Sequence, residues 1–198
     1  MKALKITGIV IGSILVLVLI AVAIVWILLS RPSKIAAGVT SVPSNAQAAQ
    51  SLDTKWNNFD STIAQSSSGT PVTVTLTQEE VNSKVNAELT TVELPDGLTV
   101  SNLNVNLRDS QILLSADLKY SVFSGRAGMT AAIQIINGQP TVVVTDVDMG
   151  SLPIPQSMQD QLTGLISGAS LFQESTAAFI MQNVQITGGE IIISGITK

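Results

Sequence analysis

The sequence has no cysteine and no histidine among its 198 residues. No disulfide can form, so the fold depends on a packed core alone. These two absences also remove the commonest ligands of zinc and other transition metals, the usual general base near neutral pH and the thiol nucleophile. We therefore predict no cofactor, no metal site and no catalytic residue, and we interpret the chain as a non-enzyme.

Charged residues are also scarce, at 12% of the chain against roughly a quarter in ordinary globular proteins. From residue 35 onward, six Lys and Arg stand against 14 Asp and Glu, which leaves this portion with a net charge of −8. An acidic domain without a basic stripe is a poor ligand for phosphate backbones. We predict no nucleic-acid partner.

One long apolar run, Ile6 to Leu29, contains no charge and no proline. As a helix it would span roughly 36 Å, enough for a hydrocarbon core of about 30 Å. Lys2 and Lys5 precede the run and Arg31 follows it, so the positive-inside bias is slight. The short leader and the long polar remainder nevertheless predict a signal anchor in residues 1–30, with the N-terminus cytoplasmic and the domain outside the plasma membrane.

A cleaved signal peptide is the alternative interpretation of this run. Its apolar core would normally be shorter, about 7–15 residues, and would end in small residues before the cut. Here no A-x-A site ends the run. Gly8 and Gly12 form a GxxxG pattern within it, which predicts close packing against a second copy or another membrane protein; ordinary glycine content of such helices is the simpler explanation.

Residues 31–45 are rich in Ser, Pro and Ala and lack periodicity, so we predict a linker. The domain is predicted to occupy residues 46–198 and to begin with an amphipathic helix, because apolar residues recur at steps of three and four from Ala46 to Ile63. A short strand with Val72, Val74 and Leu76 follows. Thr77 and Glu80 then have the spacing of a capping box at the start of a second helix.

Between residues 98 and 148 the apolar period becomes two, which predicts antiparallel strands with one buried and one wet face. Asn137-Gly138 predicts a hairpin turn, and a change of parity near Thr145 predicts a bulge. Two helical stretches, 158–166 and 171–180, and a final hairpin, 184–193, complete the chain. Helices grouped around a strand meander indicate an α+β fold.

Few acidic residues have a spacing that suggests chemistry. Asp146 and Asp148 lie two apart and could share one strand face, where paired carboxylates would bind Ca²⁺ or act as acid and base. No acidic loop supplies the further oxygens that Ca²⁺ needs, so a solvated strand end is the favoured interpretation. Lys84 and Glu88 are expected to form an ordinary i,i+4 surface pair.

Three segments after the apolar run carry a family resemblance: Val72-Thr-Val-Thr-Leu-Thr-Gln-Glu-Glu-Val, Val142-Val-Val-Thr-Asp-Val-Asp-Met-Gly-Ser-Leu-Pro-Ile-Pro, and Ile186-Thr-Gly-Gly-Glu-Ile-Ile-Ile-Ser-Gly. With the leading membrane helix, they resemble bacterial membrane-anchored YpmS-like proteins and LmeA-like exported proteins. The resemblance covers most of residues 72–198. It implies a fold of the tubular lipid-binding (TULIP, BPI-like) type, in which a curved antiparallel sheet wraps amphipathic helices and leaves an apolar groove. It transfers no ligand residue.

These observations favour a membrane-anchored binding module of the cell envelope for a lipid or another apolar ligand. The apolar strand face and the low aromatic content, 4%, suit an aliphatic chain. The candidate groove residues are apolar positions of the predicted helices: Val81, Val85, Met158, Leu162, Ile166, Phe172 and Phe179. The alternative is a non-catalytic accessory or structural subunit of a membrane or cell-envelope complex. A carboxylate-based hydrolase is the least favoured hypothesis.

Overall fold

The computed structural model describes residues 33–91, 94, 96–136, 139–150, 152, 155–157, 160–161 and 178–198. The predicted anchor and both predicted helices after Pro155 lie largely or wholly outside these residues. Within the described residues, no helix combines the length and apolar character needed to cross a membrane.

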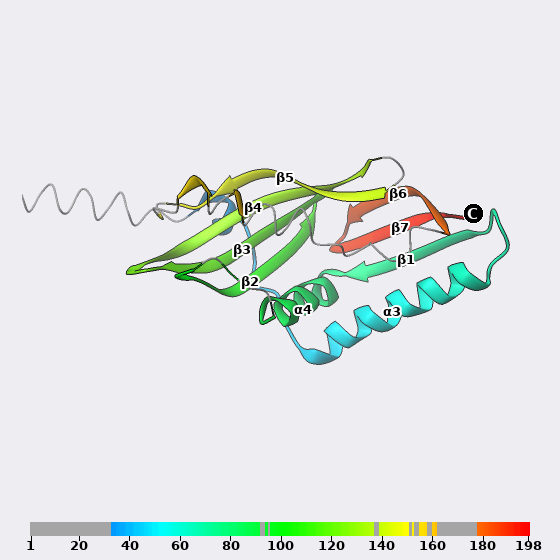
Figure 1. The fold of residues 1–198 in the computed structure, drawn as a ribbon, viewed down its shortest axis with the longest axis horizontal. Helices are drawn as coiled ribbons and strands as arrows, with labels where there is room; N and C mark the ends of the chain where they lie inside the picture. Colours follow the sequence, from blue (N-terminus) through cyan, green and yellow to red (C-terminus); the bar gives the residue numbers. More distant parts are fainter. Residues whose placement is uncertain are drawn as a thin grey trace, which may run out of the picture.

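The described elements follow the predicted order of helix, strand, helix, four strands and a final hairpin (Figure 1). They are α2 (Lys34–Ala37), α3 (Ala46–Gln65), β1 (Pro71–Thr77), α4 (Gln78–Leu89), β2 (Leu98–Arg108), β3 (Gln111–Tyr120), β4 (Phe123–Ile136), β5 (Gln139–Asp148), β6 (Phe179–Thr187) and β7 (Glu190–Thr197). The α+β class is confirmed, but the strands form two antiparallel sheets, of order β1-β7-β6 and β2-β3-β4-β5, in place of one.

The three-stranded sheet buries its inner face against α3. Phe59 of α3 meets Phe179 of β6 edge to face, with 5.2 Å between the ring centroids. The Phe179 ring lies so close to Gly195 of β7 that a Cβ there would be 2.6 Å from it. The position therefore requires glycine, and Ile193 two residues earlier is fully buried. This half of the molecule is closed by interlocking side chains.

The predicted helix 171–180 is wrong at its C-terminal end, because β6 already begins at Phe179. A bulge between Met181 and Asn183 shifts the register with β7. Inward-facing residues are therefore odd-numbered before the bulge, at Phe179 and Met181, and even-numbered after it, at Val184 and Ile186. The sequence pattern hid the first half of the strand for this reason.

Helix α4 joins the two sheets through a ladder of side-chain amides along the free edge of β2. The Gln78 carbonyl oxygen accepts from the backbone N–H of Leu107 at 2.7 Å, and the Asn82 carbonyl oxygen accepts from that of Val105 at 2.9 Å. Four helical residues advance about 6 Å and two strand residues about 6.6 Å, so the steps match. One turn further, Asn86 donates to the Leu103 carbonyl at 2.9 Å. The edge strand is thereby paired without another strand.

The segment that the sequence suggested as a linker lies, from Ser33 to Asn45, along the outer face of the four-stranded sheet. Ser33 and Ala36 are buried, and α2 rests on Gly128 of β4, where a Cβ would be 2.5 Å from the Ala36 nitrogen. Further along, Thr40 donates its backbone N–H to Asn106 at 2.8 Å. The chain that leads away from the predicted anchor is thus fixed to the sheet.

The bulge predicted near Thr145 is confirmed. Thr130 pairs with Asp146 while Ala131 pairs with Val144, so Thr145 is the extra residue of β5. The Thr145 hydroxyl donates to the Thr130 carbonyl at 3.1 Å and occupies an acceptor that the interrupted ladder leaves free.

Candidate functional site: an apolar cavity between α4 and the four-stranded sheet

The inner face of the four-stranded sheet is apolar over the side chains that the structure describes. On β3, Ile112, Leu114, Ala116 and Leu118 point to this face, as the alternation predicted. The antiparallel register sets Ala131, Met129 and Ala127 of β4 beside the first three. The result is a continuous surface of aliphatic side chains and methionine sulfur.

Helix α4 covers one end of this surface. Its capping box is present as predicted: the Thr77 hydroxyl accepts from the Glu80 backbone N–H at 3.3 Å, and the Glu80 carboxylate accepts from that of Thr77 at 2.8 Å. Val81, Val85 and Leu89 follow at helical spacing and face the sheet. The predicted stripe of the helix is therefore confirmed, and among the strands of this sheet α4 contacts mainly β2.

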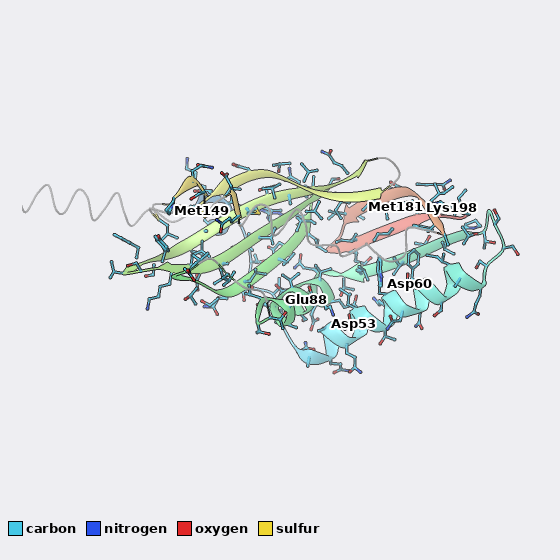
Figure 2. The ribbon with its side chains drawn as sticks, in the orientation of Figure 1. Asp53, Asp60, Glu88, Met149, Met181 and Lys198 are labelled. Atoms are coloured by element: carbon cyan, nitrogen blue, oxygen red, sulfur yellow. The ribbon has the colours of Figure 1, made fainter. Side chains whose placement is uncertain are left out.

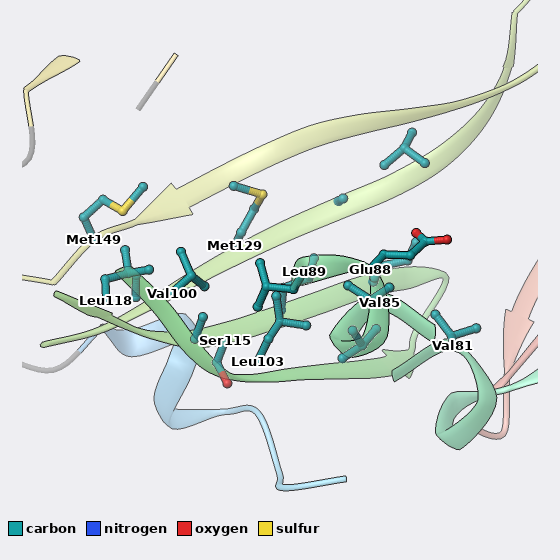
Figure 3. Close-up of a pocket in the computed structure, with 18 of the residues that line it drawn as sticks. Val81, Val85, Glu88, Leu89, Val100, Leu103, Ser115, Leu118, Met129 and Met149 are labelled. Carbon is teal, nitrogen blue, oxygen red and sulfur yellow. The ribbon is translucent and has the colours of Figure 1, made fainter. Parts of the chain in front are cut away.

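A cavity of about 260 Å³ lies between α4 and the sheet (Figure 3). Along β3 it reaches from Ile112 to Leu118, roughly 20 Å at strand rise. Val81 and Val85 mark one end, while Val100, Leu118 and Met149 mark the other. Its lining comprises Val81, Val85, Glu88, Leu89, Leu94, Val100, Leu103, Val105, Ile112, Leu114, Ser115, Ala116, Leu118, Ala127, Gly128, Met129, Ala131, Ile133, Val142, Met149 and Ile191. Glu88 is the charged member of this set and Ser115 carries its one hydroxyl.

The cavity separates two packed clusters of the protein interior. The larger cluster holds the α3 and three-stranded side and extends to Val105, Ile112 and Ala131. The smaller one consists of Leu98, Leu118 and Ala127, with Met149 and other half-buried residues against it. Since both clusters contribute to the lining, the cavity interrupts an apolar layer that would otherwise run through the whole domain.

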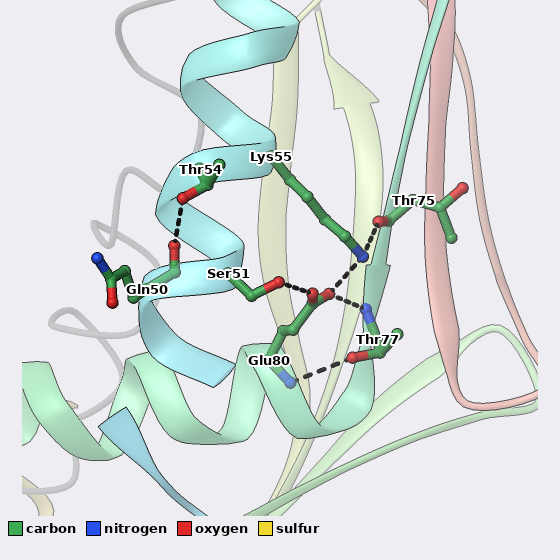
Figure 4. Close-up of polar contacts among 7 residues, drawn as sticks. All are labelled: Gln50, Ser51, Thr54, Lys55, Thr75, Thr77 and Glu80. Carbon is green, nitrogen blue, oxygen red and sulfur yellow. Dashed lines mark hydrogen bonds and ion pairs between the residues drawn. The ribbon is translucent and has the colours of Figure 1, made fainter. Parts of the chain in front are cut away.

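A partly buried ion pair fixes the wall formed by α4 (Figure 4). The Glu80 carboxylate accepts from Lys55 at 2.8 Å and from the Ser51 hydroxyl at 2.6 Å, both on α3. Lys55 also donates to the Thr75 carbonyl of β1 at 3.0 Å. Burial by itself would raise the pKa of Glu80, but the hydrogen bonds from Lys55, Ser51 and the Thr77 backbone outweigh it, and the pKa is lowered.

A second ion pair crosses between the helices at the surface. Lys84 contacts Asp53 of α3 at 2.7 Å and Glu88 at 3.5 Å, which confirms the predicted i,i+4 pair. Figure 2 shows Asp53 and Glu88 on adjacent stretches of α3 and α4. The hydrogen bond that Lys84 donates to the Asp53 carboxylate is the main cause that raises the pKa of Lys84. Together with Glu80, these contacts hold α4 at a set distance from the sheet.

The structure places three of the seven predicted groove residues. Val81 and Val85 line the cavity. Phe179 does not; it is buried against Phe59 in the three-stranded half. Met158, Leu162, Ile166 and Phe172 lie outside the described residues.

Most of the lining comes from strand residues that were not among the seven predicted groove residues. Leu103, Met129 and Ile133 are examples. Their alternation shows which face is buried, but it does not show how much of that face a helix covers. The signal that could have revealed the cavity was length, because strands such as β3 extend much further in space than helix α4. A short helix leaves part of a long strand face uncovered.

Of the predicted pair Asp146 and Asp148, Asp148 has structural partners. The Asp148 carboxylate accepts from the backbone N–H of Lys34 at 2.7 Å and from that of Gly150 at 2.9 Å. It therefore caps the first turn of α2. Among the residues that the structure describes, no three acidic side chains gather into a group that could hold a metal ion.

Comparison of the sequence with known protein families, with curated proteins and with solved structures gives no match. The resemblance to YpmS-like and LmeA-like proteins therefore stays a prediction, and the functional argument depends on the cavity.

Proposed function

We propose that this chain is a membrane-anchored, extracytoplasmic module that binds a lipid-like ligand in the cavity between α4 and the four-stranded sheet. The observation that carries the proposal is the cavity lining, whose described side chains are aliphatic or methionine apart from Glu88 and Ser115. An aliphatic chain is the ligand that such a wall accommodates without leaving a polar group unpaired.

The size of the cavity agrees with a single acyl chain or a similar apolar group. An engineered cavity of about 150 Å³ already holds a benzene molecule, and the cavity here is about 260 Å³. Each buried methylene contributes about 0.8 kcal/mol, so eight contribute about 6 kcal/mol. Association itself costs about 4 kcal/mol or more. We expect weak, reversible binding, which suits a protein that accepts and releases a lipid.

The membrane location rests on the Ile6–Leu29 run and on the basic leader before it. Protease added to intact cells or protoplasts should remove the domain. Full protection, with cleavage in lysed controls, would contradict the proposed topology.

The binding proposal is tested by blocking the cavity. Ala116 lines it from β3, so Ala116→Phe should fill part of the volume and weaken binding of a fluorescent fatty acid at least tenfold. Ala132 of β4 points to the opposite face of the sheet, because its neighbours Ala131 and Ile133 line the cavity. Ala132→Phe is the matched control and should bind as the unmodified chain does.

Binding would be measured by titration of the detergent-solubilised full chain, alongside native mass spectrometry for co-purified lipid. Equal affinity of both variants would place the binding site elsewhere. Absence of fatty-acid uptake and of retained lipid in all three proteins would contradict the proposal and favour an accessory subunit of an envelope complex.

A further inference from the structure

The turn between β3 and β4 exposes apolar side chains at the tip of a long hairpin. Val122 at its apex is 85% exposed and Phe123 is 40% exposed. Tyr120 faces Phe123 across the hairpin. The chain has one tyrosine and four phenylalanines, and two of these five rings occupy this turn.

The other two described hairpin turns have ordinary composition. Asp109-Ser110 joins β2 to β3 and Gly188-Gly189 joins β6 to β7, all four with positive φ, as tight hairpins require. At the β3–β4 turn, Ser121 takes a φ of +56°, and the next residue is a β-branched valine. Water-exposed turns favour Gly, Asn or Asp. Valine at this apex is explained if the apex does not face water.

The tip lies at the end of the four-stranded sheet that is remote from the three-stranded sheet (Figure 1). At the opposite end, the Ser110 backbone N–H reaches the Ile186 carbonyl of β6 at 3.3 Å. The tip end is also the side of the cavity that is marked by Leu118 and Met149 (Figure 3). A ligand that enters or leaves at this end would do so beside the tip.

The chain toward the predicted anchor leaves from the same half of the sheet. Ser33 sits over Gly128 of β4, and α2 is capped by Asp148 at the end of β5. Leu29, the end of the apolar run, is four residues before Ser33, so the two are at most about 14 Å apart. Phe123 is five residues from Gly128 along β4, about 17 Å. The tip therefore lies within about 35 Å of the end of the apolar run, close enough to reach the bilayer surface when the domain tilts toward it.

We propose that the β3–β4 tip, Tyr120 to Phe123, inserts into the outer surface of the membrane that holds the anchor, and that the Leu118 end of the cavity thereby faces the lipid. This rests on the anchoring part of the proposed function. Lys119 is exposed beside the tip, while Arg126 pairs with Asp117 at 3.9 Å. Among the described residues from Gln111 to Ile136, Lys119 is the one cation without an ion pair. One such cation is no basic patch, so insertion is proposed to depend on apolar contact and to occur equally on uncharged lipid and at high salt.

The absence of cysteine from the sequence makes single-site fluorescent labelling unambiguous. The full chain carrying Val122→Cys would be labelled with an environment-sensitive dye and reconstituted into phosphatidylcholine nanodiscs. The reference is the same labelled chain in lipid-free buffer with urea. Relative to it, we expect the dye emission to shift to shorter wavelength and to rise several-fold. Lipids spin-labelled near the headgroup should quench this emission. Ile180→Cys is the control, because Ile180 is an apolar residue of β6 in the other sheet whose exposure, 42%, matches that of Phe123; its dye should remain water-like and unquenched.

A water-like Val122 dye, or equal quenching at Val122 and Ile180, would overturn the proposal. A second variant, Val122→Ser with Phe123→Ser, should leave fatty-acid affinity in detergent unchanged but slow transfer of the fluorescent fatty acid from vesicles to the cavity at least tenfold. Unchanged transfer would also contradict tip insertion. Insertion of the tip without any fatty-acid binding would support this proposal while removing the proposed ligand, so the two failures are distinguishable.

Discussion

The three-stranded and four-stranded halves have similarly alternating strands but differ in how long a helix each receives. Helix α3 has 20 residues, about 30 Å, and β1 beside it has seven, about 23 Å. Helix α4 has 12 residues, about 18 Å, against the ten of β3, about 33 Å. Within the described residues, the first sheet is covered along its length and the second only in part.

The polar side of α4 explains why this helix covers so little of the sheet. Gln78, Asn82 and Asn86 are occupied with the edge of β2, and Glu80 is occupied with α3. Only the Val81 and Val85 side remains for the apolar layer. A helix bound on three sides cannot slide along the sheet, so the cavity beside it is a fixed feature of the packing.

The strongest test of this comparison removes the same side chain from each half. Ile193 is fully buried in β7, and Ile193→Ala should lower the free energy of unfolding by about 3–5 kcal/mol through lost burial and a new void. Ile133 borders the existing cavity, and Ile133→Ala should cost only about 1–2 kcal/mol, because fewer neighbours lose contact. Urea unfolding of the detergent-solubilised chain, followed by near-ultraviolet circular dichroism, gives both values. Equal losses would show that the two halves are packed alike.

The amide ladder gives the next largest expected effect. Asn82 is fully buried; it also donates to the Val42 carbonyl at 3.0 Å. Asn82→Ala leaves the Val105 N–H buried and unpaired and should cost about 2–3 kcal/mol. Asn57, which is exposed on α3, provides the control, and Asn57→Ala should change stability by less than about 0.5 kcal/mol. Hydrogen exchange should show faster exchange at Val105 in the first variant alone.

Much of this fold was predictable because its local signals are strong. Thr77 with Glu80 located the start of α4, the alternation from Ile112 to Leu118 located β3, and the parity change located the bulge at Thr145. The division into two sheets was not predictable. It depends on β1 pairing with β7, more than a hundred residues later, and no local pattern specifies a partner that distant.

The site was predictable only in part, for a related reason. Val81 and Val85 were found because their helix is amphipathic. Phe179 was misplaced because a bulge disguised its strand. The ladder was missed although Gln78, Asn82 and Asn86 repeat every four residues, because a polar stripe at that spacing ordinarily faces solvent. Its function is visible only once β2 lies beside it.

Substitution of Glu80 tests whether its ion pair and hydrogen bonds hold α4 against α3. The Glu80 side chain is 8% exposed, and Glu80→Gln should cost about 1–2 kcal/mol at neutral pH by weakening its bonds to Lys55 and Thr77. Its folded pKa lies below the ordinary 4.5. The contribution is therefore complete above pH 4.5 and is lost as pH falls through the lower folded value.

Unfolding of both proteins at pH 7 and pH 3 should show the difference between them shrinking in acid. Glu79→Gln is the matched control, since Glu79 is an exposed neighbour in the same helical turn, and the hydrogen bond described for its side chain is the one it accepts from Asn45 at 2.8 Å. A difference that grows in acid would mean that Glu80 is protonated in the folded protein and that the ion pair does not hold the helix.

The smallest expected effect concerns the contact between the four-stranded sheet and α2, the helix at the start of the described chain, on the side of the predicted anchor. Asp148 caps α2, and burial would raise the pKa of Asp148, but the bonds from Gly150, Lys34 and Ser33 outweigh it and lower the value below 3.8. Asp148→Asn should therefore cost about 1 kcal/mol at neutral pH, and this loss should fade as pH falls below 3.8. Asp146→Asn, two residues away on the exposed strand surface, should cost less than about 0.5 kcal/mol. Equal effects of the two substitutions would revive the interpretation of a shared carboxylate site. The expected inequality, together with faster hydrogen exchange at Lys34 in Asp148→Asn alone, would show that the Asp148 side chain helps to fasten the tether to the sheet.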